Sequence, residues 1–339
     1  MITIIGGGIA GVCIALKLSK YGRKITIYEE KELLSTPYCH LHLGGSLYPE
    51  ISLDEAVELY NESFLFLKEF PQFIKMTKTK LFLSNLTSDE KKHLLFRCNM
   101  LDMMHQNDFG TPYYEKIDDN TLIVSEYIIM EKELKQELKD RLYDEILANR
   151  IIVMYEKFVP NNGQHGPIMG PMMGPILIRT GCSVANPVEH KGNWIFRYES
   201  PIDLPYELAY LGKRNTPNAL LQITPIDDYS VVIHKMNSEC SIVDDIHTLV
   251  SDKQRTDRLI EFMRDNVPAI LSEVRPEAII FNHYDQQVRR DGKRTSKINV
   301  MQNGNEMIID VILIKACGVV QVTNSIIDII SQKIKNNVV

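Results

Sequence analysis

The chain has 339 residues, enough for two domains and a sizeable core, and its 44% hydrophobic and 24% charged composition is that of an ordinary soluble globular protein. A net charge of −6 lacks the positive balance of nucleic-acid-binding proteins, so no nucleic acid is predicted as a partner. Six cysteines without a C-x-x-C pair predict neither a zinc site nor a disulfide framework, and no apolar run approaches the roughly 18 residues of a membrane span. By default, we expect a reducing cytoplasm as the location.

The first thirty residues predict a strand, a glycine turn and a helix. Ile2–Ile5 form a short apolar strand, and three glycines with G-x-G-x-x-G spacing lead into a helix over 12–21. The first glycine allows the tight turn, the second lets the backbone approach a pyrophosphate, and the third allows close packing of helix on strand. The N–H groups of the helix N-terminus favour phosphate. The predicted contacts are Gly6, Gly8, Ile9, Ala10 and Gly11.

A second strand, over 23–28, ends at an acid. It brings Glu29, with Glu30 beside it, to the place where a carboxylate accepts hydrogen bonds from a ribose 2′-OH, about 20 residues after the glycines. An acid there argues against a 2′-phosphate, and therefore against NADP. The complete set of strand, turn, helix and acid predicts dinucleotide binding; the alternative is a strand-turn-helix without a ligand.

The stretch 36–49 contains His40 and His42, followed by Gly44, Gly45 and Ser46. Two histidines without a third ligand nearby do not predict a metal site. Glycines suit a backbone pressed against a flat ligand, because residues without Cβ allow that approach.

Together, the glycine motif with Glu29, the Gly/Ser-rich loop and the aromatic-Pro step after it resemble the FAD-dependent oxidoreductases of the D-amino-acid oxidase, glycine oxidase and sarcosine oxidase superfamily. The resemblance implies FAD as the cofactor, with its pyrophosphate at the glycines and its ribose at Glu29. Some flavoproteins join a histidine covalently to the ring, so His40 and His42 can be tested for this. The isoalloxazine would contact His42, Leu43, Gly44, Gly45, Ser46 and Leu47.

The central part of the chain predicts helices over 52–70, 87–104 and 131–150, and strands over 76–83, 122–130 and 151–159. By resemblance, Phe158 and Val159 would contact the adenine. Gly-Pro then recurs at 166, 170 and 174, which excludes a helix or a central strand there. Two interpretations of this segment stay open: a disordered surface loop and a mobile lid over the active site. The next strand would end at the flavin with Thr180 and Gly181.

The pattern is β-rich after residue 186, with strands over 194–198, 219–224 and 230–235, a helix over 252–265 and return strands over 278–290. It resembles the antiparallel substrate-side sheet of the superfamily, in which an arginine before an Asp-Gly turn grips a substrate carboxylate. Arg289 has that position, and its planar fork suits the role. A solvated basic turn is the alternative. Tyr284 and Tyr229 are the expected hydrogen-bond partners of the substrate.

The last strand is expected over 307–314, followed by a turn and a helix over 324–334. In the superfamily this turn is glycine-rich, and the helix N-terminus faces the pyrimidine end of the flavin. The expected cofactor contacts are Gly318, Val319 and Val320. Gly318 is the only glycine of the turn, a departure that bears on catalysis more than on binding.

We therefore expect an α/β fold in which an antiparallel substrate domain, 76–121 and 186–277, is inserted into a Rossmann-like FAD-binding domain, 1–75, 122–185 and 278–339. The expected reaction is hydride transfer to FAD from the C–N bond of a small amino-acid-like or amine substrate. The alternatives are a 2-hydroxy-acid dehydrogenase or oxidase and a non-catalytic flavin-binding subunit.

Overall fold

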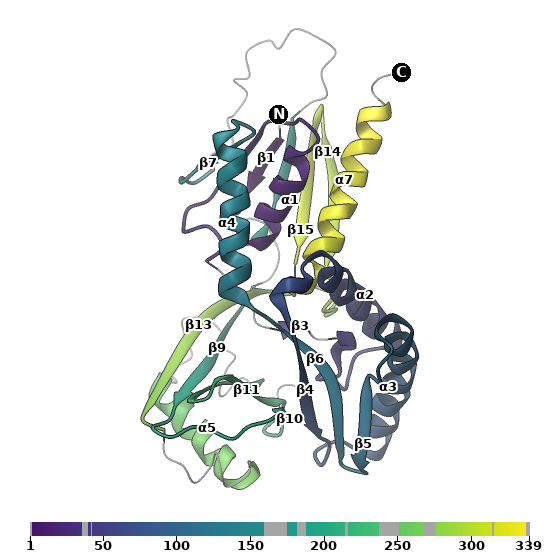
Figure 1. The fold of residues 1–339 in the computed structure, drawn as a ribbon, viewed down its shortest axis with the longest axis vertical. Helices are drawn as coiled ribbons and strands as arrows, with labels where there is room; N and C mark the ends of the chain where they lie inside the picture. The colour runs from purple at the N-terminus through teal and green to yellow at the C-terminus, as the bar shows by residue number, and fades with distance from the viewer. Residues whose placement is uncertain are drawn as a thin grey trace.

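The computed structural model describes residues 2–35, 40–41, 43–158, 175–181, 188–213, 216–236, 251–267, 276–313 and 315–336. Two sheets divide these residues into an upper and a lower part in Figure 1. Nearly all of the Gly-Pro segment, for which a loop and a lid were both considered, lies outside the described residues. None of the described helices is both long and apolar enough to cross a membrane.

The upper sheet has six strands in the order β14-β15-β8-β1-β2-β7. Five neighbouring strands are parallel, and only the edge strand β14 pairs in the antiparallel sense. The alternating Ile residues of the first two strands bury one face, as Ile4 and Ile27 illustrate. The strands are β1 (Ile2–Ile5), β2 (Ile25–Tyr28), β7 (Ile151–Met154), β8 (Ile176–Arg179), β14 (Lys297–Asn303) and β15 (Glu306–Ile312).

Three helices, α1 (Ile9–Ser19), α4 (Glu131–Leu147) and α7 (Val319–Asn336), lie side by side over one face of this sheet (Figure 1). The central helix α1 contacts both neighbours. Helix α4 buries Leu134, Leu138 and Leu142, which recur at helical spacing along one face. The predicted Rossmann-like arrangement is therefore present.

The lower sheet has nine strands, in the order β13-β9-β12-β11-β10-β4-β6-β3, with β5 pairing to β6. All pairs are antiparallel except β10 with β4. Helix α5 (Asp252–Asn266) adds Leu259 and Met263 to the apolar cluster around Trp194. The strands are β3 (His40–Leu41), β4 (Ile74–Phe82), β5 (Tyr114–Asp118), β6 (Thr121–Ile129), β9 (Val188–Arg197), β10 (Glu207–Tyr210), β11 (Leu221–Asp227), β12 (Ser230–Lys235) and β13 (Ala278–Gln287).

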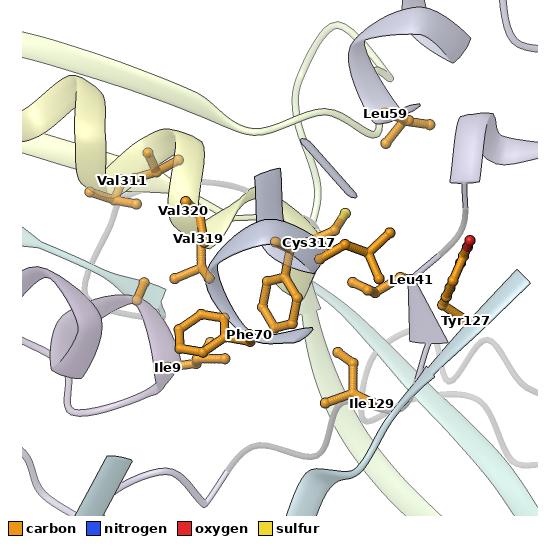
Figure 2. Packing of buried hydrophobic residues seen from close by; sticks show 14 of the residues in the cluster. Ile9, Leu41, Leu59, Phe70, Tyr127, Ile129, Val311, Cys317, Val319 and Val320 are labelled. Atoms are coloured by element: carbon orange, nitrogen blue, oxygen red, sulfur yellow. The ribbon is translucent and has the colours of Figure 1, made fainter. Parts of the chain in front are cut away.

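Helix α2 (Leu53–Glu69) connects the two parts of the molecule. It contacts the 3-10 turns η1 (Leu43–Gly45) and η4 (Ala316–Gly318), helix α7 and helix α3 (Ser88–Phe109), and it leads into the short turn η2 (Pro71–Phe73). Figure 2 shows Phe70, just after α2, packed among Ile9 and Val319. The core is therefore continuous from the helices of the upper sheet to the base of the lower one.

Two observations refine the sequence interpretation. Strands β6 and β13 pair within the lower sheet, although the predicted boundaries give both segments to the FAD-binding domain. The final helix begins at Val319 rather than at 324. β-branched valines have a low helix propensity, but the burial of Val319 and Val322 stabilises this additional first turn.

Candidate functional site

The glycine turn after β1 is held against the end of β8. Gly6 has φ of 102°, and a Cβ there would lie 2.5 Å from Thr180 Oγ1. The Thr180 hydroxyl is 3.0 Å from the carbonyl oxygens of both Ile5 and Gly6. A Cβ on Gly11 would lie 1.9 Å from the Gly6 carbonyl oxygen. Only glycine therefore allows α1 to approach the turn this closely.

The N-terminus of α1 opens onto free space. Gly8 is the N-cap and provides no side-chain cap, and the first turn has no acidic residue. The first N–H groups of a helix lack intrahelical acceptors and favour an anion. A Cβ on Gly8 or on Gly181 would meet nothing within 4 Å. Gly8 and the following Ile9 and Ala10 therefore fit a pyrophosphate.

Glu29 is fixed at the end of β2 by two backbone donors. Its Oε2 accepts the Gly7 N–H at 2.6 Å, and its Oε1 accepts the Lys31 N–H at 2.9 Å. Each carboxylate oxygen has a second lone pair for a ribose hydroxyl. The neighbouring Glu30 makes no such backbone contact among the hydrogen bonds of the described residues, so Glu29 is the better fit to the ribose.

The residues expected at the adenine follow β7. Phe158 lies edge-on to Tyr28, the last residue of β2, with ring centroids 5.1 Å apart. Val159 lies outside the described residues. The adenine contact of these two residues stays a prediction.

The Gly-Gly-Ser loop forms η1, and its glycines are required by contacts inside the protein. Gly44 and Gly45 have φ of 67° and 62°. A Cβ on Gly44 would lie 2.3 Å from Leu101, and one on Gly45 would lie 2.6 Å from Ile51. These contacts with α3 and the start of α2 are a reason for the glycines that the sequence did not reveal.

The same loop is anchored by buried polar groups. The Leu43 N–H donates to Glu126 Oε2 at 3.1 Å, and the Tyr113 hydroxyl contacts both Ser46 Oγ and the Leu43 carbonyl oxygen. Burial raises the pKa of Tyr113 well above its ordinary value, so this hydroxyl stays neutral and able to donate. These hydrogen bonds and the buried side chain of Leu47 thus hold the loop in a fixed position. His42 and the side chain of His40 lie outside the described residues.

Arg289 is engaged within its own loop. Its Nε and Nη2 donate to the Asp291 carboxylate at 2.9 and 2.5 Å, and its Nη1 donates to Thr295 Oγ1 at 2.9 Å. Its side chain is only 11% exposed. The hydrogen bond from Arg289 holds the pKa of Asp291 below its usual value. In this arrangement Arg289 shapes the loop and is largely buried, and its contact with a substrate carboxylate stays a prediction.

Tyr229 lies far from Arg289 along the lower sheet, so the structure does not bring these two predicted substrate contacts together. It is 48% exposed, at the hairpin between β11 and β12. The adjacent Ser230 pairs with Arg197, the last residue of the ten-residue strand β9. The first residue of β9 pairs with Gln287, two residues before Arg289. Ten strand residues span about 30 Å. Tyr284 pairs with Lys191 in the backbone, and its side chain lies outside the described residues.

The structure brings other side chains together around Tyr48, which is 4% exposed. The Arg294 guanidinium lies 3.8 Å from the centroid of the Tyr48 ring and pairs with Glu50 at 3.0 Å. The Lys315 ammonium donates to the Tyr48 hydroxyl at 2.7 Å. Sequence reasoning missed this cluster, although Tyr48 directly follows the Gly/Ser loop and Lys315 directly precedes the final turn.

A small cavity adjoins the cluster. Leu220 and Met236, at the ends of β11 and β12, line it together with Tyr48 and Arg294. Its volume of about 10 Å³ suffices for about one water molecule. A cavity of about 240 Å³ lies elsewhere, over the second half of α1 between α4 and α7, and therefore away from the glycine turn.

The final turn contacts a buried carboxylate. A Cβ on Gly318 would lie 1.8 Å from Ser296 Oγ and 3.0 Å from Glu62 Oε2. Because these two groups fill the space, the turn needs glycine at this position. Val319 and Val320 are buried in the core, so any flavin contact from them would be made by the backbone. No group of three His, Cys, Asp or Glu side chains suited to a metal occurs within the described ranges.

Comparisons with known proteins agree with this geometry. Residues 1–94 match the family DAO, described as FAD dependent oxidoreductase. Glycine oxidase from Geobacillus kaustophilus is similar in structure, with a TM-score of 0.62 and 12% identity, over 96% of this chain and 93% of that one.

Two further structures have the same fold. L-proline dehydrogenase from P. horikoshii matches with a TM-score of 0.60 and 15% identity, over 94% of this chain and 89% of that one. Glycerol-3-phosphate dehydrogenase from Bacillus halodurans, complexed with FAD, matches with a TM-score of 0.57 and 12% identity, over 98% of this chain and 64% of that one.

The glycine turn and Glu29 have the geometry that the sequence predicts for a dinucleotide site, the first 94 residues match the family, and the described chain has the fold of these enzymes. The resemblance inferred from the sequence is therefore supported in two ways: residues 1–94 match the FAD dependent oxidoreductase family, and the described chain has the fold of glycine oxidase.

Proposed function

We propose that this protein transfers a hydride to FAD from the carbon of a C–N bond in a small amino-acid-like or amine substrate. The upper sheet with its helices would bind FAD, and the lower sheet would cover the substrate. When bound, FAD supplies the hydride acceptor. The chain therefore has to bind the substrate, orient it and exclude water.

The observation that carries the proposal is the pair of cations at Tyr48. Arg294 and Lys315 converge on one buried ring where the Gly/Ser loop, the loop 289–296 and the final turn meet. Cations at such a junction favour a substrate carboxylate, and arginine binds one bidentately. The names of glycine oxidase and L-proline dehydrogenase, which share the fold, support a substrate of the amino-acid class.

Each side chain has a distinct role in this proposal. Arg294 holds the substrate carboxylate, and Lys315 adds positive charge beside the final turn. Leu220 and Met236 cover the apolar part of the substrate from the lower sheet. Because the cavity holds about one water, Arg294 must leave Glu50 and the Tyr48 ring before a substrate can enter. Arg289 keeps the loop in shape through Asp291.

The test is anaerobic bleaching of the flavin by a panel of amino acids, N-methyl amino acids and 2-hydroxy acids, with ammonia or amine release measured. Bleaching by amino compounds alone supports the proposal. Bleaching by hydroxy acids alone supports the 2-hydroxy-acid alternative, and a yellow protein that none of them bleaches favours a non-catalytic flavoprotein.

A variant tests the assigned cation. A charged hydrogen bond contributes about 1.5–3 kcal/mol, so Arg294→Met should raise the substrate concentration for half-bleaching about tenfold or more. Lys293→Met is the matched control, because it removes the same charge from an exposed neighbour. Equal effects of the two substitutions would remove Arg294 from the site.

A further inference from the structure

We propose that Glu62 is a positioning residue that takes up a proton when the flavin is reduced, and so couples the final turn and the loop 289–296 to the redox state. The proposal rests on the proposed function in one respect, namely that the upper sheet binds FAD, with the N-terminus of α7 facing the flavin as the family resemblance implies. No residue of the nucleotide motif is involved.

One carboxylate from α2 contacts both segments. Glu62 Oε1 accepts the Ser296 N–H at 2.8 Å, and Glu62 Oε2 is 3.9 Å from Cys317 Sγ, which donates to it. The same Oε2 would be 3.0 Å from a Cβ on Gly318, so it lies against the backbone of the final turn. Glu62 is 1% exposed. A change in its charge therefore acts directly on both segments.

Helix α2 holds the same loop at a second place, two turns earlier. Glu55 Oε1 accepts the Arg294 N–H at 2.6 Å, and Glu55 is also buried, at 7% exposure. Glu55 and Glu62 thus make the same kind of bond to the same loop. Of their interactions within the described residues, only those of Glu62 reach the final turn.

Burial and the neighbouring Glu58 favour a proton on Glu62, whereas hydrogen bonds from Ser296 and Cys317 favour the carboxylate. Glu58, on its own helix, repels a charge on Glu62. From the final turn it faces the Cys317 thiol, whose pKa is raised by burial, and Lys315, next to that thiol, donates to Tyr48. From the loop, Arg289 contacts the Ser296 carbonyl oxygen at 3.4 Å. Within the described residues, no Lys or Arg nitrogen lies within 4.0 Å of Glu62.

Burial outweighs the Ser296 hydrogen bond and raises the pKa of Glu62 to about 7. The carboxyl is therefore close to half-protonated near neutral pH, where a modest change in local potential shifts its protonation. Helix α7 begins at Val319, one residue after Gly318. Negative charge at that helix N-terminus repels a carboxylate at Glu62 and raises its pKa further.

The balance of charge is simple. The electron pair enters the flavin with the hydride from the substrate carbon. The proton comes from solvent and binds Glu62, which changes from carboxylate to carboxylic acid. The protonated group still accepts the Ser296 N–H through its carbonyl oxygen.

The test measures the midpoint potential of the FAD-bound protein from about pH 6 to about pH 8, on either side of the Glu62 pKa. One additional proton per two electrons steepens the slope by about 30 mV per pH unit. The wild type should have this steeper segment near neutral pH. Glu62→Gln should lose it, and the matched control Glu55→Gln should keep it.

An infrared difference spectrum between oxidised and reduced protein gives a second readout. The wild type and Glu55→Gln should gain a protonated-carboxyl band on reduction, and Glu62→Gln should not. Identical slopes and bands in all three proteins would overturn the proposal while leaving FAD binding intact. A protein that binds no FAD would instead refute the proposed function, and this inference with it.

Discussion

At the scale of single residues, the positions with the strictest requirements are those where a side chain would displace its neighbours. A Cβ on Gly11 would lie 1.9 Å from the Gly6 carbonyl oxygen, and Gly318 leaves room for Ser296 and Glu62. The first requirement is visible in the G-x-G-x-x-G spacing. The second depends on residues 62 and 296, which are far apart in the sequence, so no local pattern indicates it.

Glu62 should make stability depend on pH. Its pKa is raised from 4.5, the ordinary value of a glutamate side chain, to about 7 in the folded protein, so its burial penalty is absent below about pH 4.5 and complete above about pH 7. The difference between the two pKa values corresponds to about 3 kcal/mol of unfolding free energy, which is lost as pH rises through this window. Glu62→Gln should therefore be more stable than wild type at high pH and similar to it at low pH. Urea unfolding at both pH values measures this, and an equal effect at both would contradict it.

At the scale of elements, α2 and α3 position the loop that contains Tyr48. Arg97 of α3 is 1% exposed and donates to the carbonyl oxygens of Ile51 and Tyr48, each at 3.0 Å. Burial lowers the pKa of Arg97, although two carbonyl acceptors and the nearby Glu50 and Glu55 favour its charge. The loop between η1 and α2 is thus held from both sides.

Arg97→Met should destabilise this loop. Each of the two buried carbonyl groups would lose a hydrogen bond from a charged donor, at a cost of about 1.5–3 kcal/mol each, and would keep only its other partner. The expected loss of unfolding free energy is therefore several kcal/mol, measured by chemical denaturation. His93→Met is a suitable control, because His93 contacts the same Ile51 carbonyl oxygen from the same helix without being fully buried. An equal loss in both variants would show that Arg97 has no special role.

At the scale of the whole molecule, the two sheets share a core through α2 and Phe70 (Figure 2). The ends of strands β1, β2 and β8 that carry Gly6, Glu29 and Thr180 meet at one edge of the upper sheet. Parallel strands bind ligands at their carboxyl ends, which explains why these segments come together.

FAD should stabilise the fold as a whole, because it binds the folded protein alone. At a free FAD concentration 100 times the Kd, the free energy of unfolding should rise by about 2.7 kcal/mol, and this increase should grow with the FAD concentration. Thermal unfolding with added FAD measures it. Gly11→Ala should abolish the effect, since its Cβ would displace the turn. A melting temperature independent of FAD in the wild type would contradict FAD binding.

The sequence by itself determined the nucleotide end, because that end is a local feature: strand, glycine turn, helix and acid occupy thirty consecutive residues whose order implies their geometry. It also predicted an FAD-binding fold with an added β-rich part. Only the tertiary structure decided the other end, where Tyr48, Arg294 and Lys315 meet from three separate segments and Glu62 contacts Ser296 and Cys317. The tertiary structure also shows that Arg289 is bound to Asp291 and Thr295 of its own loop, and that Tyr229 lies at the far end of the lower sheet. Hydrogen-bond partners and strand register are long-range properties, and motif spacing does not encode them.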